Sequence, residues 1–200
     1  MIRVLLLRCC SLLLPIVAML ASPSWAQPQR PILHELVLTP TDQEVLLHLS
    51  LKGGFHQELL EAIESGMPIT ITYYMRLYRK RGLWFDEEVL AKSIKHIVKY
   101  DTLKKQYRVS EINGLFSSLK VTRDEPTMMQ WMSAIEGQPL IPFYLLQPGE
   151  EYYVKAMADL KTVQSPFPLS HIPFLASLWD TGTAWTVSSP FAMNTPQPQR

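Results

Sequence analysis

The sequence predicts a mainly β protein, built as an antiparallel sandwich with two short α-helices packed on it. Apolar and polar residues alternate along several segments, as they do in strands that bury one face and expose the other. Turn-forming residues separate these segments at short intervals, and helical spacing of apolar residues is confined to a few short stretches. Many short strands of this kind favour a β-sandwich that is immunoglobulin-like in broad architecture.

The first 26 residues have the three parts of a secretory signal peptide. Arg3 and Arg8 form the positive start, Cys9–Ala21 carries no charge, and Ser24-Trp25-Ala26 places small residues around a cleavage site. We therefore expect Sec-type export to the periplasm with cleavage after Ala26; an uncleaved interfacial anchor is the alternative. Neither apolar run reaches the ~18 to 20 residues that a membrane-spanning helix needs.

Both cysteines, Cys9 and Cys10, lie in this segment, so the mature chain is predicted to lack disulfides and cysteine-bound metals. A lipoprotein signal requires a small residue directly before its cysteine, and Arg8 stands there instead, so a lipid anchor on Cys9 is not expected. After the signal peptide we expect a flexible leader over residues 27–31, one β-sandwich domain over residues 32–190 and a disordered tail over residues 191–200.

Strong alternation predicts three strands, which cover Val45–Lys52, Ile69–Tyr78 and Tyr152–Lys161. Weaker alternation predicts four more, over Leu33–Thr39, Gln106–Ile112, Leu115–Thr122 and Ala184–Ser188. A turn at Pro40–Gln43 joins the first two strands in chain order.

Two segments have the helical spacing of apolar residues. The first helical face consists of Phe55, Leu59, Leu60 and Ile63, and its helix is predicted to end at Gly66. The second consists of Met128, Trp131, Met132 and Ile135, in a helix that begins at Asp124 and Pro126 and ends at Gly137. This Met and Trp stripe is more typical of core packing than of a cofactor site.

The segment Val89–Tyr100 fits both a helix and a strand. We predict a strand, because it would pair with Gln106–Ile112 across the turn Asp101–Lys105. A second hairpin would follow if it also pairs with Ile69–Arg81. The helical alternative stays open on the sequence alone.

Motifs for catalysis or metal binding are missing from the sequence, so no catalytic residue, metal or cofactor is predicted. No two histidines have helical ligand spacing, and His34 and His48, which could meet across a hairpin, are better explained as solvated strand residues. The acidic runs Asp86–Glu88 and Glu150–Glu151 leave an envelope hydrolase as an alternative, although solvated loop charge explains them more simply.

Charge is unevenly distributed along the chain: Arg76–Arg108 holds ten Lys or Arg and four Asp or Glu, although the whole chain is formally only +1. Nucleic acid is not an expected partner of a chain so close to neutral. A hairpin in this segment would carry arginines and aromatic residues at its tip, suited to a partner protein or the anionic surface of a membrane. The predicted partner surface comprises Arg76, Arg79, Arg81, Trp84 and Phe85. Protection of an edge strand is the alternative explanation for these charges.

Four segments carry a resemblance to a known family: Gly66–Ile71, Arg79–Asp86, Tyr100–Val109, and a C-terminal group of Pro166–Leu169, Pro173–Leu175, Trp179 and Trp185. On these residues the chain resembles the bacterial exported family called domain of unknown function 4390. Leu83 departs from the pattern, because many members are expected to have a second aromatic residue there.

The resemblance implies export in Gram-negative bacteria and a non-enzymatic role. Members are often encoded beside a membrane sensor histidine kinase of the nitrogen-regulation type, which implies such a kinase or another envelope protein as partner. We therefore predict a periplasmic interaction accessory of envelope signalling. The alternative is a carrier of a small apolar ligand, held between the sheets or under Trp131 and Trp179.

Overall fold

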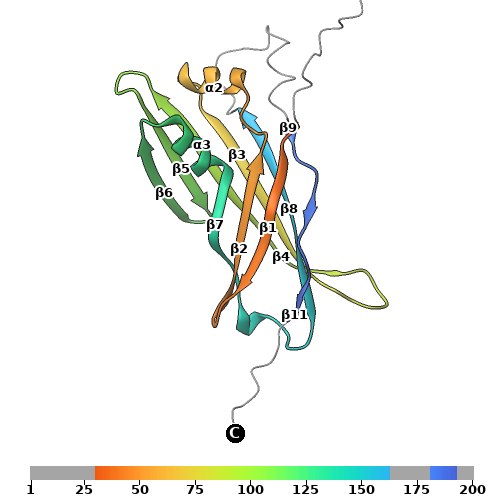
Figure 1. Ribbon diagram of the computed structural model, residues 1–200. Coiled ribbons are helices and arrows are strands. Elements are labelled where there is room, and N and C mark those ends of the chain that lie inside the picture. Colours follow the sequence, from red (N-terminus) through yellow and green to blue (C-terminus); the bar gives the residue numbers. More distant parts are fainter. Residues whose placement is uncertain (1–29, 163–180, 193–200) are drawn as a thin grey trace, which may run out of the picture.

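The protein is mainly β and antiparallel with two α-helices, as predicted, in a computed structural model that describes residues 30–162 and 181–192. Two sheets lie face to face along an elongated body (Figure 1). The predicted signal peptide, most of the leader, residues 193–200 of the tail, and Trp179 lie outside the described residues. Within the described ranges, no helix has the length and apolar character needed to cross a bilayer.

The larger sheet has the strand order β10-β8-β3-β4-β5-β6, and all of its pairs are antiparallel. Its strands are β3 (Ile69–Arg79), β4 (Glu87–Asp101), β5 (Gln106–Asn113), β6 (Phe116–Thr122), β8 (Glu151–Thr162) and β10 (Thr186–Val187). The two-residue strands β9 (Thr181–Gly182) and β11 (Phe191–Ala192) also pair with β8. The central strands β3, β4 and β8 are the longest, and they give the body its elongated shape.

The smaller sheet comprises β1 (Ile32–Pro40), β2 (Glu44–Lys52) and β7 (Ala134–Pro142). Strand β2 shows the predicted alternation, because Val45, Leu47, Leu49 and Leu51 are buried and the residues between them are not. These side chains meet the buried row of β3, which includes Ile71, Tyr73, Met75 and Leu77. The core therefore fills the space between the two sheets.

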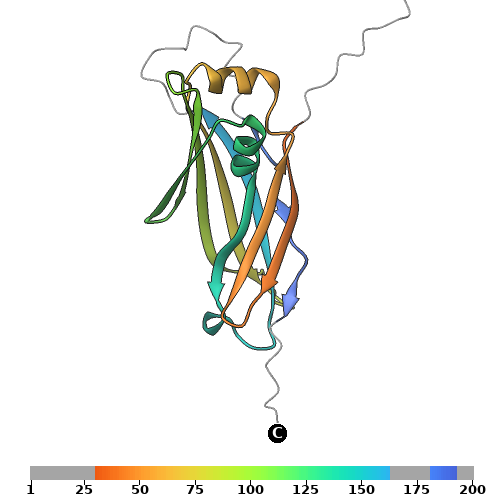
Figure 2. The ribbon, with the colours of Figure 1, turned by 60° about the vertical axis from the view of Figure 1, so that its left-hand side comes forward.

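Both helices lie near one end of the sandwich, α2 (Gln57–Glu64) across that end and α3 (Glu125–Ser133) beside it (Figure 2). Asp124 begins α3 as predicted, since its carboxylate accepts a hydrogen bond from the Thr127 backbone N–H at 2.9 Å. The helix ends at Ser133 rather than at the predicted Gly137, because the chain from Ala134 onward forms strand β7, which pairs with β2. Ile135, predicted to lie on the helical face, is therefore part of this strand.

The ambiguous segment Val89–Tyr100 is a strand, as predicted. It forms most of β4, which pairs with β3 on one side and with β5 on the other. A central strand satisfies its backbone groups on both sides, and its inward residues Ile94, His96 and Val98 are buried between the sheets.

Three other predicted boundaries were also wrong. Only Thr186 and Val187 of the predicted strand Ala184–Ser188 pair with β8. Phe191 and Ala192, predicted to be in the tail, form β11, because the Phe191 ring packs on Tyr152 with centroids 5.8 Å apart. Pro31, predicted to be in the flexible leader, is buried directly before β1.

Candidate functional site

The most prominent feature of the surface is the projecting hairpin, which we define as residues 76–91. It consists of the ends of β3 and β4 with the loop 80–86 between them, and the loop extends away from the body (Figure 1). Leu77 pairs with Leu90 and Tyr78 with Glu88, so Val89 is an extra residue that forms a β-bulge in β4. Bulges bend and twist a strand, and this one lies where the hairpin leaves the sheet.

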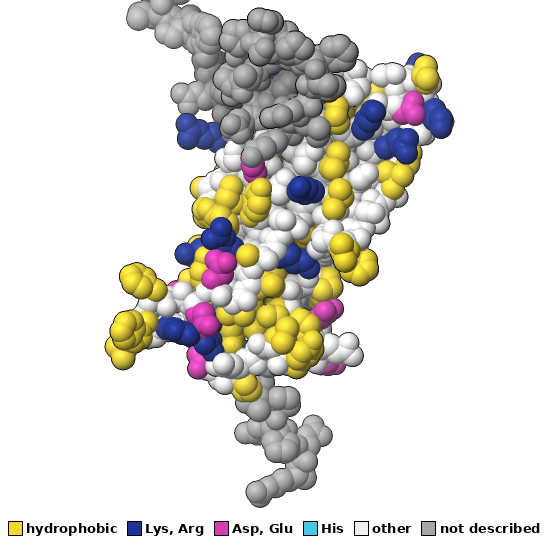
Figure 3. Space-filling model, turned by 180° about the vertical axis from the view of Figure 1, so that it is seen from behind, with side chains coloured by type: hydrophobic (Ala, Val, Ile, Leu, Met, Phe, Trp, Pro, Cys, Tyr) yellow, Lys and Arg dark blue, Asp and Glu magenta, His cyan; other side chains and the backbone are white. Residues whose placement is uncertain are grey.

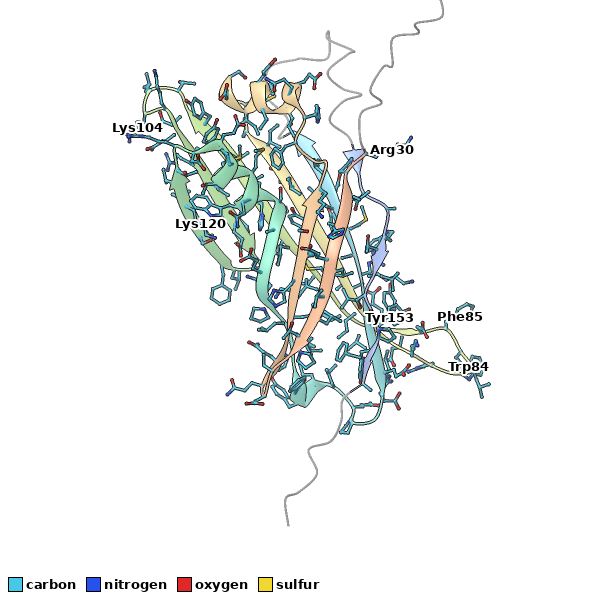
Figure 4. The ribbon with its side chains drawn as sticks, viewed as in Figure 1. Arg30, Trp84, Phe85, Lys104, Lys120 and Tyr153 are labelled. Atoms are coloured by element: carbon cyan, nitrogen blue, oxygen red, sulfur yellow. The ribbon has the colours of Figure 1, made fainter. Side chains whose placement is uncertain are left out.

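Three consecutive large apolar side chains occupy the tip of the projecting hairpin. Leu83 is 94% exposed, Trp84 79% and Phe85 95%. Figure 4 shows Trp84 and Phe85 at the far end of the loop, away from every other element. Contiguous apolar groups exposed in this way are typical of a surface that binds another molecule.

The basic side chains of the hairpin are paired with acidic ones. Arg76 contacts Glu88 at 3.3 Å, and Lys80 contacts Glu151 at the start of β8 at 3.0 Å. Arg79 and Arg81 both bind the Glu87 carboxylate. The positive charge that the sequence concentrates here is therefore largely balanced within the hairpin and its neighbour β8.

Two carboxylates of the hairpin, those of Asp86 and Glu87, have lowered pKa values. The hydrogen bond from Arg79 is the main reason why the pKa of Glu87 is lowered, and Arg81 adds to it. The Tyr153 hydroxyl donates to Asp86 at 2.7 Å and is the main cause of the lowered pKa of that carboxyl. Burial, and then this bond to Asp86, raises the pKa of Tyr153 to about 12.

Aromatic stacking supports the base of the hairpin on the outer face of the large sheet. Tyr78 and Tyr153 stack with centroids 5.5 Å apart, and the Lys155 ammonium lies 4.9 Å from the centre of the Tyr78 ring. Arg76 lies 5.4 Å from the ring centre of Trp185, on the segment that leads into β10. Side chains from strands β3 and β8 and from that segment thus fix the direction in which the loop projects.

All five residues of the predicted partner surface lie on this hairpin. Trp84 and Phe85 are at the tip, whereas the three arginines lie nearer the base and are already bound to glutamates. Sequence reasoning missed Leu83 as a member of the apolar tip, although it stands directly before Trp84. It also missed Tyr153, which reaches Asp86 only through the β3–β8 register.

The acidic run that suggested a hydrolase has structural hydrogen bonds. Glu88 accepts from Arg76 and from the Tyr78 hydroxyl at 3.0 Å, and Asp86 accepts from Tyr153 and from the Arg81 backbone N–H at 3.1 Å. The hydrogen bonds to Asp86 lower its pKa, whereas a general acid must hold a proton near neutral pH. The arrangement is suited to holding the loop in place.

The histidines that might have met across a hairpin do not face one another. Val37 pairs with His48, whereas His34 pairs with Ser50. The His48 ring accepts the Gly137 backbone N–H at 3.2 Å. Over residues 30–162 and 181–192, no three His, Cys, Asp or Glu side chains gather closely enough to hold a metal ion.

The cleft predicted between the sheets is occupied by core side chains, among them Met128 and Met132, which are fully buried. Trp131, predicted to roof such a cleft, is half-buried at the edge, with the Lys120 ammonium 5.6 Å from its ring centre.

A family model described as "Domain of unknown function (DUF4390)" matches residues 29–189, which is most of the chain. No curated protein and no solved structure matches the chain.

Proposed function

Since the chain belongs to the DUF4390 family, a domain of unknown function, we propose that it is an exported, non-enzymatic interaction accessory of envelope signalling. The projecting hairpin is the surface that binds its partner, an envelope protein such as a membrane sensor histidine kinase. Export is supported by the signal peptide pattern of Met1–Ala26, and the kind of partner by the family resemblance drawn from the sequence.

The observation that carries this proposal is the exposed apolar tip. Leu83, Trp84 and Phe85 lose little or no contact with water on folding, so they add little to the stability of the domain. Trp is among the residues that contribute most to protein interfaces once buried there. A tip of this kind is suited to filling an apolar pocket on a partner.

The ion pairs at the base of the projecting hairpin hold its tip in one orientation. Arg79 and Arg81 share Glu87 across the two arms, and the Lys80 backbone N–H donates to the Glu151 carbonyl at 2.9 Å. A loop held in this way loses less conformational freedom on binding than a mobile one. The arginines therefore act mainly by positioning the aromatic residues, and only secondarily as contacts to the partner.

The proposal is tested by crosslinking in cells that export the protein, with identification of the captured proteins by mass spectrometry. We expect a specific membrane signalling protein, crosslinked at the hairpin. The variant with Leu83→Ser, Trp84→Ser and Phe85→Ser should lose this crosslink and weaken binding of the purified partner by about thirtyfold or more.

A matched control is available where β5 connects to β6: Leu115 in the turn and Phe116, the first residue of β6, are also strongly exposed. The variant with Leu115→Ser and Phe116→Ser should keep the crosslink and the affinity. If the tip variant folds normally and binds the partner as tightly as this control, the hairpin is not the binding surface.

A further inference from the structure

The opposite end of the large sheet carries basic side chains that have no acidic partner. Lys99 of β4, Lys104 and Lys105 of the β4–β5 turn and Arg108 of β5 form no ion pair within the described part of the chain. Basic side chains gather at the upper right of Figure 3, far from the projecting hairpin at the lower left. Figure 4 likewise places Lys104 and Phe85 at opposite ends of the molecule. Within the basic segment Arg76–Arg108, the positive charges near the β4–β5 turn are therefore not paired with acidic side chains of the described residues, whereas those of the projecting hairpin are.

A groove of about 520 Å³ opens beside these residues on the outer face of the sheet. Its apolar lining includes Ile97 of β4 and Leu119 of β6, and Leu119 is 54% exposed. Its basic lining consists of Lys99 and Arg108. The volume is within the range of sites that hold small organic ligands.

Strand register explains why the groove has one apolar and one basic part. Ile97 pairs with Ser110, which pairs with Leu119, so these residues form one row across three strands. Lys99 pairs directly with Arg108 in a parallel row two residues further along β4. The rows are adjacent on one face, because side chains two residues apart in a strand point to the same side.

Two like charges placed directly opposite one another destabilise a sheet, unless an anion lies between them. The one acidic residue in the lining, Asp101, is engaged elsewhere: its Oδ1 accepts the backbone N–H groups of Leu103 at 3.2 Å and Lys104 at 3.0 Å. Those two bonds shape the turn, but their donors are neutral backbone groups, so the lining holds one acidic side chain beside two basic ones. Lys99 and Arg108, which form no ion pair in the described part of the chain, complement an external anion.

We propose that this groove binds an anionic amphiphile, a molecule with a phosphate or carboxylate head and a single alkyl chain. The head lies between Lys99 and Arg108, and the chain lies along Ile97 and Leu119. This inference is independent of the proposed hairpin function, because the two sites share no residue.

The test is isothermal titration calorimetry, in which dodecyl phosphate is added to the purified protein at concentrations below its critical micelle concentration. Inorganic phosphate tests the head alone, and dodecylphosphocholine tests the same chain with a neutralised head. We expect dodecyl phosphate to bind at least about tenfold more tightly than either control, since one lacks the apolar contact and the other the net negative charge.

Two double variants with equal charge loss locate the site. Lys99→Gln with Arg108→Gln should weaken dodecyl phosphate binding by about tenfold or more, and Lys104→Gln with Lys105→Gln by less than about threefold. Equal loss in both variants would mean that net charge alone attracts the ligand, and the proposed site would be wrong. Equally tight binding of inorganic phosphate, or no binding of dodecyl phosphate, would also overturn it.

Discussion

The backbone carbonyl of Met132 lies where α3 meets the large sheet, and two side chains of that sheet satisfy it. It is among the last four carbonyls of α3, which have no partner within the helix. The Tyr73 hydroxyl donates to it at 2.8 Å, and His96 Nδ1 lies 3.1 Å from it. Since a carbonyl can only accept, Nδ1 must carry the hydrogen of the neutral ring. Removing either donor leaves one bond, and removing both leaves a buried carbonyl without a partner.

These contacts set the expected energies. Tyr73→Phe keeps the buried ring and removes one hydrogen bond, which should lower the free energy of unfolding by about 1 kcal/mol. His96→Phe also removes one bond, but it eliminates Nε2, a buried atom with no hydrogen-bond partner, so its cost should be smaller. The double variant should cost about 1 to 2 kcal/mol more than the sum of the single costs, since it orphans the carbonyl.

Urea unfolding of the four proteins at pH 7.5, followed by tryptophan fluorescence, measures this coupling as a double-mutant cycle. The slopes of the transitions should agree among the four proteins, so that midpoints can be compared. Additivity within about 0.5 kcal/mol would refute the idea that the two side chains stabilise α3 through one shared acceptor.

Three further predictions concern single positions. Burial lowers the pKa of His96, so the native state binds fewer protons than the unfolded state below about pH 6.5. Stability should then fall as the pH drops below that value, by at most about 1.4 kcal/mol per pH unit from this one group, and urea unfolding from pH 7.5 to 5 should show a shallower fall for His96→Phe. In Tyr153→Phe, NMR titration should show the pKa of Asp86 rising toward its ordinary value, because its main hydrogen-bond donor is lost; an unchanged pKa would contradict this assignment. Gly66→Ala should lower the free energy of unfolding by about 1 kcal/mol, since Gly66 has φ +91°, whereas Gly82→Ala, with open space around it, should have little effect.

The strands with strict alternation could be predicted from sequence, because their pattern comes from burial on one face only. Strand β7 could not, since Gly137, Pro139 and Pro142 interrupt its alternation and it pairs with β2, far back in the sequence. Its formation also moved the end of α3, because a segment committed to a sheet cannot continue a helix. The pattern of apolar residues in a short segment reflects only the local preference of that segment for helix or strand. Strand β7 forms because it pairs with β2, and this long-range pairing overrides the local preference.

The candidate site was predictable in its location and less so in its electrostatics. Arginines and aromatic residues near one turn indicated a binding surface, and the structure does place them on one hairpin. What the sequence did not show is that Arg79 and Arg81 share Glu87, because that depends on which residues of β3 and β4 lie opposite one another. Because of this register, the basic segment forms a hairpin that is nearly neutral where it joins the sheet and apolar at its tip.

The same register separates two kinds of chemistry along β4. This strand spans 15 residues, which corresponds to about 50 Å at the usual rise per residue. At its beginning, Glu87 and Glu88 neutralise the arginines of β3; near its end, Lys99 faces Arg108, and no acidic side chain of β5 is opposite. A Debye length at physiological ionic strength is about 8 Å, so charge at one end has little direct effect at the other. Loss of binding at the hairpin should therefore leave the groove's affinity for an anionic amphiphile unchanged, and a measured dependence between them would require a conformational link through the sheet.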